Sequence, residues 1–153
     1  MVLPMKYLGL LLIVFATLAL NSCQKDEGLN PGGGMSGSYV IVAQINGQAW
    51  GADDGFAKYV PPFGLEIRGS YGTASNIIIN ISPYNGIDTY PLNGITKVTY
   101  FEGGKEYTST TGQITITAED NNYIDGLFNC ELISNSGGPS LNFTGGEFHV
   151  PKF

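Results

Sequence analysis

The fold class follows from the stretch Tyr39-Val40-Ile41-Val42-Ala43-Gln44-Ile45-Asn46-Gly47-Gln48-Ala49-Trp50. Residues 39–45 are mostly β-branched or aromatic, a composition that favours an extended strand. Asn46-Gly47 follows directly, and this dipeptide is the strongest short signal for a two-residue hairpin turn. The stretch therefore predicts two antiparallel strands joined by a tight turn.

The same pattern of short strands and turns continues along the chain. Residues 77–79 are three consecutive isoleucines, which predict a strand that is covered on both faces at the centre of the core. Residues 114–118 alternate between inward isoleucine and outward threonine. At Gly145-Gly146, the alternation of apolar and polar residues in the last strand moves by one position. One inserted bulge residue has this effect. The expected strands are 39–45, 48–50, 56–60, 63–70, 76–82, 88–92, 95–102, 105–110, 114–118, 123–134 and 141–150.

These strands predict an all-β antiparallel domain. They recur at intervals of about 8 to 12 residues, with turn signals between them, as in sandwiches and barrels. Sequential hairpins after Thr96 favour a meander. We favour a two-layer β-sandwich with meander hairpins, and a flattened, lipocalin-like β-barrel is the alternative, because both architectures have the same sequence pattern.

A lipoprotein-type signal precedes this domain. Lys6 is followed by an apolar run over 7–20 and by small Asn21-Ser22, which is the layout of a secretory signal peptide. The run is shorter than the roughly 20 apolar residues that cross a bilayer. With Cys23 next, the segment resembles a bacterial lipobox, in which the cysteine is acylated, for example with palmitate, and residues 1–22 are removed. The alternative is an ordinary thiol after an ordinary signal peptide.

The residues after Cys23 carry a second signal. Lys25-Asp26-Glu27 resembles the export signal that directs lipoproteins of Bacteroidota to the outer face of the outer membrane. The alternative is a solvated charge cluster. Residues 23–37 are rich in glycine and predict a flexible tether, followed by one domain over 38–153. We expect this domain to face the cell surface, with a periplasmic orientation as the alternative.

Composition limits the partners. Removal of residues 1–22 leaves 131 residues with 6 Lys/Arg against 13 Asp/Glu, a formal charge of about −7. An acidic surface does not favour nucleic acid. If Cys23 is acylated, Cys130 is left without a disulfide partner, and its strand parity predicts a small buried hydrophobe. The sequence has no cluster with metal-ligand spacing, and we expect no metal and no cofactor.

A set of short motifs resembles one family over nearly the whole domain. In chain order they are AQINGQAWGA (43–52), TYPL (89–92), GQITIT (112–117), IDGLF (124–128) and GGEFHV (145–150). They are similar to small lipoproteins of Bacteroidota in a domain-of-unknown-function family, number 6252. The resemblance implies an exported location and a β fold, and it transfers no activity and no catalytic residue.

No catalytic site is predicted. His149 is the single histidine, and it has the opposite parity to the apolar residues of the last strand, which indicates a surface position. No nucleophile elbow accompanies it. The acidic pairs Asp53-Asp54 and Glu119-Asp120 lie in turn regions, where aspartate side chains commonly accept hydrogen bonds from backbone N–H groups. We therefore expect that the chain is not an enzyme.

Aromatic side chains are the candidate ligand-binding residues, because rigid amphipathic rings suit recognition of sugars or proteins. Tyr59, Tyr84 and Tyr90 lie in or beside predicted loops and edge strands, and Trp50 follows the first hairpin. The alternatives are that the tyrosines simply cover the sheet and that Trp50 fills the core.

The sequence thus predicts a non-enzymatic, surface-exposed outer-membrane lipoprotein whose β domain binds a glycan, a peptide or an envelope protein. The alternative is an accessory subunit of an outer-membrane complex, in which an edge strand near Pro91 or Phe153 pairs with a partner. A third possibility, an enzyme, needs a cleft that gathers Asp53, Asp54 or His149.

Overall fold

The computed structural model describes residues 40–153, so the predictions for residues 1–37, including Cys23 and Lys25-Asp26-Glu27, lie outside the described part. The described residues form strands and turns, which confirms the all-β prediction. None of their segments is a helix long and apolar enough to cross a bilayer. The strands are β1 (Ile41–Ile45), β2 (Gln48–Ala52), β3 (Asp54–Val60), β4 (Gly64–Tyr71), β5 (Ser75–Ile81), β6 (Thr89–Pro91), β7 (Lys97–Glu102), β8 (Lys105–Glu119), β9 (Tyr123–Ser134) and β10 (Leu141–Pro151).

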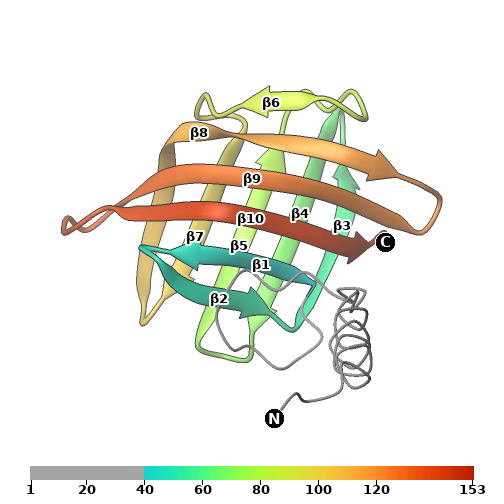
Figure 1. Cartoon of the computed structure of the whole chain (residues 1–153). Helices are drawn as coiled ribbons and strands as arrows, with labels where there is room; N and C mark the ends of the chain where they lie inside the picture. Colours follow the sequence, from blue (N-terminus) through green and yellow to red (C-terminus); the bar gives the residue numbers. More distant parts are fainter. Residues whose placement is uncertain (1–39) are drawn as a thin grey trace, which may run out of the picture.

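One antiparallel sheet contains all of these strands. Its order is β2-β1-β10-β9-β8-β7-β5-β4-β3, and β6 pairs with β8 outside this path. The sheet folds back into two layers whose strands cross, with β1, β2, β9 and β10 in front of β3, β4 and β5 in Figure 1. β8 bends and connects the two layers. Its first residues pair with β7, and its pairing with β9 is interrupted by register shifts at Ser109/Thr111 and Ile116/Ala118, where bulges bend the strand.

Strand β3, at one end of the sheet, meets the residues that follow β10 and nearly closes the sheet into a barrel. Ala57 and Lys152 form a parallel bridge. The Phe153 N–H donates to the Ala57 carbonyl at 2.8 Å, and the Phe153 ring packs edge-on against Phe56 with 5.3 Å between centroids. The architecture therefore has the two layers of a sandwich and the continuous, curled sheet of the barrel alternative.

The core between the layers is built on aromatic rings. Tyr100 and Phe143 are fully buried, and Trp50 contacts both edge-on at centroid distances of 5.6 and 6.5 Å. The indole N–H of Trp50 donates to Ser75 Oγ at 2.9 Å, so the polar atom of the ring is satisfied.

The isoleucine run in β5 corrects one prediction. Ile77 and Ile79 are fully buried, whereas Ile78 is partly exposed. The prediction that this strand is covered on both faces is wrong, because the second layer covers only the inner face of the sheet.

Local backbone predictions compare well with the structure. Asn46 and Gly47 have φ values of 51° and 81° and form the two-residue turn between β1 and β2. The pairing of β10 with β9 shifts register between Phe143 and Gly146, which confirms the bulge. The predicted strands 105–110 and 114–118 are one strand, because bulges let pairing with β9 continue on both sides.

A glycine allows the two layers to touch. A Cβ atom at Gly69 in β4 would lie 2.6 Å from Ile41 Cδ1 and 2.9 Å from Ala52 Cβ. Both distances are shorter than any normal carbon contact. The hairpin of β1 and β2 therefore packs directly on the backbone of β4.

Candidate functional site

Three connecting segments meet at one end of the barrel, and we call their surface the apolar tip. They are the β3–β4 turn (60–64), the loop after β5 (82–88) and the loop before β7 (92–96). They leave the sheet side by side because β5 pairs with β4 on one edge and with β7 on the other. The Tyr84 N–H donates to the Phe63 carbonyl at 2.8 Å and joins the first two segments.

The apolar tip exposes large apolar side chains and almost no charge. The exposed fraction is 73% for Phe63, 67% for Ile95 and 64% for Ile87. Within the three segments, Asp88 is the one charged residue. Exposed apolar surface of this kind marks an interaction site when it is contiguous.

Two shallow depressions flank the β3–β4 turn. One, of about 300 Å³, is lined by this turn together with Tyr59 and Tyr84. The other, of about 360 Å³, is lined by the turn together with Ile81, Ile95 and Lys97. Both volumes lie at the lower end of the range for small-molecule sites, so they suit individual side chains of a partner.

A glutamate beside the apolar tip joins two of the predicted tyrosines. Glu119, the last residue of β8, accepts hydrogen bonds from the Tyr59 and Tyr84 hydroxyls, the latter at 2.7 Å. Lys152 Nζ lies 2.9 Å from Glu119 Oε1 and 5.3 Å from the centre of the Tyr59 ring. The two tyrosine rings are 6.0 Å apart. We call these four residues the Glu119 cluster.

The pKa values of the cluster follow from these contacts. Burial alone would raise the pKa of Glu119, but the hydrogen bonds from Tyr59, Tyr84 and Lys152 outweigh it and hold that pKa below its ordinary value. Burial, and then the hydrogen bond to Glu119, raises the pKa of both Tyr84 and Tyr59. The cluster at neutral pH is therefore a carboxylate surrounded by two neutral phenols and an ammonium.

Two predicted ligand-binding residues lie out of reach of a ligand. Tyr90 is only 7% exposed, stacks on Tyr84 at 5.9 Å and donates its hydroxyl hydrogen to the Gly86 carbonyl at 2.7 Å. Trp50 lies in the core. This corrects the interpretation of Trp50 and Tyr90 as ligand-contacting residues, because a ring without an open face cannot stack on a ligand. Tyr59 and Tyr84 keep that interpretation.

The other chemically reactive residues are not part of the apolar tip, although the Asp120 carbonyl accepts a hydrogen bond of 2.8 Å from Lys152 of the Glu119 cluster. His149 is exposed, pairs through Nδ1 with Asp125 and stacks on Tyr123 at 4.6 Å. Asp120 accepts two backbone N–H groups of the following turn at 2.7 Å. Burial raises the pKa of the Cys130 thiol to about 12, which keeps it protonated. Among residues 40–153, no three His, Cys, Asp or Glu side chains are grouped to hold a metal ion.

Sequence reasoning missed Lys152 and Phe63 and treated Glu119 as a turn residue. β8 continues as far as Glu119, and the closure of the sheet brings its side chain to Tyr59. Local patterns do not encode that long-range contact. The uncharged run Tyr59-Val60-Pro61-Pro62-Phe63 in a turn region is the signal that could have identified the tip.

The fold and the site define an all-β, barrel-like domain with an apolar, partly aromatic tip. The family model described as "Domain of unknown function (DUF6252)" matches residues 38–151. The chain belongs to this family, as the motifs in its sequence predict. No curated protein and no solved structure matches the chain.

Proposed function

We propose that the chain is a non-enzymatic binding module that is anchored to the outer membrane through a lipid on Cys23 and that binds an envelope protein through the apolar tip. The signal-like segment 1–22 supports export, and Lys25-Asp26-Glu27 supports a position on the cell surface. The glycine-rich tether over 23–37 then separates the domain from the lipid.

The observation that carries this proposal is the exposure of Phe63 between the two depressions. A partner that covers Phe63, Ile87 and Ile95 removes apolar surface from water, which is worth roughly 25 cal/mol per Å². Aromatic residues that fill or border pockets in this way dominate the energies of protein interfaces. The tip therefore supplies the apolar centre that a protein interface needs.

The polar atoms beside the tip favour a protein over a glycan at this surface. The hydroxyls of Tyr59 and Tyr84 are already bonded to Glu119, and Lys152 is paired with the same carboxylate. A sugar on this surface would lose hydrogen bonds to water without replacing them, which costs free energy. An apolar side chain of a protein makes no hydrogen bonds to water, so it does not have this cost. A protein partner is also what an accessory subunit would need.

A photo-crosslinking amino acid in place of Phe63 tests the proposal in intact cells. The same substitution at Tyr71 is the control, because Tyr71 is also exposed (48%) but ends β4 at the opposite end of the layer. We expect discrete adducts at position 63 and none at position 71. The captured protein, once purified, should bind a Phe63→Asp/Ile95→Asp variant at least about tenfold more weakly than the wild type. Equal adducts at both positions, or an unchanged affinity, would overturn the proposal.

The location has its own test. Cys23→Ala should release the protein from the outer membrane in fractionation, because acylation is lost. Replacing Lys25, Asp26 and Glu27 by alanine should protect the domain from protease added to intact cells while leaving it in the outer membrane. Protection of the wild type would instead place the domain in the periplasm.

A further inference from the structure

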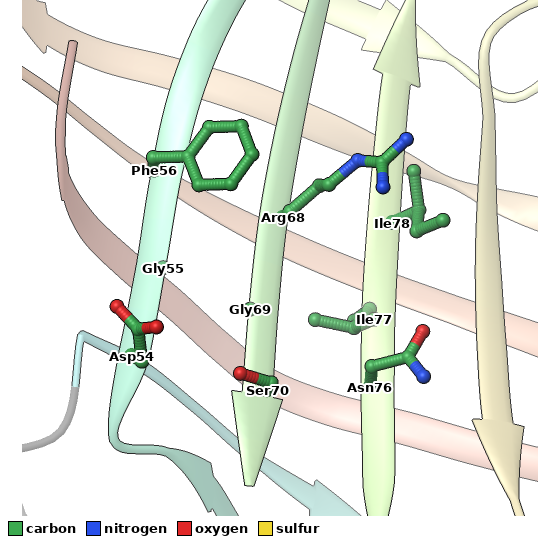
Figure 2. A pocket seen from close by; sticks show the side chains of 9 residues that line it. All are labelled: Asp54, Gly55, Phe56, Arg68, Gly69, Ser70, Asn76, Ile77 and Ile78. Atoms are coloured by element: carbon green, nitrogen blue, oxygen red, sulfur yellow. The ribbon is translucent and has the colours of Figure 1, made fainter. Parts of the chain in front are cut away.

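A second surface, separate from the apolar tip, has the features of a small-ligand site. A pocket of about 260 Å³ lies on the outer face of β3, β4 and β5. Figure 2 shows that its side chains form two rows across these strands. The first row, paired in register, is Phe56, Arg68 and Ile78. The second row, paired in the same way, is Asp54, Ser70 and Asn76.

The floor between the two rows is bare backbone. Gly55, Gly69 and Ile77 occupy the intervening register positions, and the Ile77 side chain is fully buried on the inner face. Alternate residues of a strand are about 6.6 Å apart. The side chains of the two rows take up part of this spacing and leave room for about one layer of atoms, so a ring can stand edge-on above the floor and contact both rows.

The rows offer both donors and acceptors to such a ring. Asp54 and Asn76 are exposed and Ser70 is partly exposed, so their polar atoms are open to a ligand. Arg68 Nε donates to Glu66 at 2.8 Å, which fixes the guanidinium and leaves its terminal amino groups for other acceptors. Phe56 and Ile78 supply apolar surface beside them. This mixture of apolar lining and a few placed polar groups is typical of a small-ligand site.

We propose that this pocket binds one neutral sugar ring of a glycan. A hydroxyl group both donates and accepts, so hydroxyls at opposite edges of the ring can donate to Asp54 and accept from Asn76 and Arg68. The ligand is neutral because the charges of this face balance: Lys58 and Arg68 both pair with Glu66, at 3.0 and 2.8 Å, and Asp54 supplies the second negative charge. The inference does not depend on the proposed function, since it concerns a different surface.

Nuclear magnetic resonance titration of the full chain tests this site, in a detergent without a sugar headgroup. The probes are methyl β-glucoside, methyl β-galactoside and N-acetylglucosamine, with glucuronate and glucosamine as charged comparators. We expect at least one neutral probe to shift the amide signals of Gly55 and Gly69 saturably. The dissociation constant should be on the order of 1 to 10 mM, as suits a shallow site for a single ring.

Matched variants separate this pocket from general surface effects. Asp54→Ala and Asn76→Ala should each weaken the binding by about tenfold, because each removes one hydrogen-bonding partner. Asn80→Ala is the control, since Asn80 lies on the same strand and face but outside the pocket, and it should bind as the wild type does. The proposal is overturned by the absence of saturable shifts with all three neutral probes, by shifts confined to the apolar tip, by an equal effect of Asn80→Ala, or by tighter binding of a charged comparator.

Discussion

The Tyr84 hydroxyl donates a hydrogen bond of 2.7 Å to Glu119 Oε2, and this contact joins the loop after β5 to the end of β8. Glu119 also pairs with Lys152, which follows β10. The carboxylate therefore holds together parts of the sheet that are far apart in the sequence.

Glu119→Gln should lower the free energy of unfolding by about 1 to 3 kcal/mol, because hydrogen bonds to a charged group are stronger than those to a neutral amide. Urea unfolding at neutral pH measures the difference. Glu131→Gln, on the exposed face of β9, is the control and should change stability by less than about 0.5 kcal/mol. Equal losses in the two variants would contradict the role assigned to Glu119.

Acid should destabilise the wild type more than Glu119→Gln. The pKa of Glu119 in the folded state lies below its ordinary value of 4.5. A carboxyl group of this kind adds stability above its unfolded pKa, and this stability is lost as pH falls through the folded pKa. The difference in stability between the two proteins should therefore shrink between about pH 5 and pH 3. Urea titrations at several pH values test this, and a constant difference would disprove the linkage.

Deletion of Phe153 should lower the free energy of unfolding by about 1 to 3 kcal/mol, because the bond to Ala57 and the ring contact with Phe56 are both lost. Phe153→Ala keeps the backbone N–H and removes only the ring, so it should recover part of the loss. If the two variants are equally stable, the hydrogen bond from the Phe153 N–H to the Ala57 carbonyl contributes nothing to the stability of the fold.

Gly69→Ala should destabilise the fold by about 1 to 3 kcal/mol, because the new methyl group overlaps Ile41 and Ala52. A second substitution, Ile41→Val, removes the Cδ1 atom that lies nearest and should restore part of the stability. Thermal unfolding followed by circular dichroism compares the single and double variants. Additive losses would show that the overlap with Ile41 is not the cause.

Cys130 should be inert in the folded protein. Its thiol is buried, and burial raises its pKa to about 12, whereas alkylation requires an exposed thiolate. In a Cys23→Ala background, iodoacetamide labelling should remain slow in buffer and should accelerate with urea in step with unfolding. Rapid labelling without urea would mean that β9 opens locally.

Local features of this fold were predictable from sequence because neighbouring residues determine them. The Asn46-Gly47 turn, the bulge in β10 and the buried parity around Cys130 depend on a few adjacent positions. The three isoleucines of β5 were misleading, because a β-branched run satisfies strand propensity whether one face or both are covered. Ile78 lies on the uncovered face.

The candidate sites depend on long-range contacts, so sequence reasoning reached them only in part. Aromatic character and loop positions predict Tyr59 and Tyr84 as ligand-contacting residues, but Glu119 reaches them only once the sheet has curled. The sugar pocket arises from the registers of three strands, which local patterns do not specify. A hydrophobic pattern sets which face is buried, and the pairing partners are set by the whole fold.

The pairing of β1 with β10 has a consequence for folding during synthesis. Ile41 lies opposite Phe148, so the first strand finds its second neighbour only near the other end of the domain. Pairings between distant segments form slowly, because the intervening chain must first be ordered. A chain that emerges from the ribosome from its N-terminus cannot complete this sheet until β10 has been synthesised. The topology therefore delays closure of the sheet until nearly the whole domain is available.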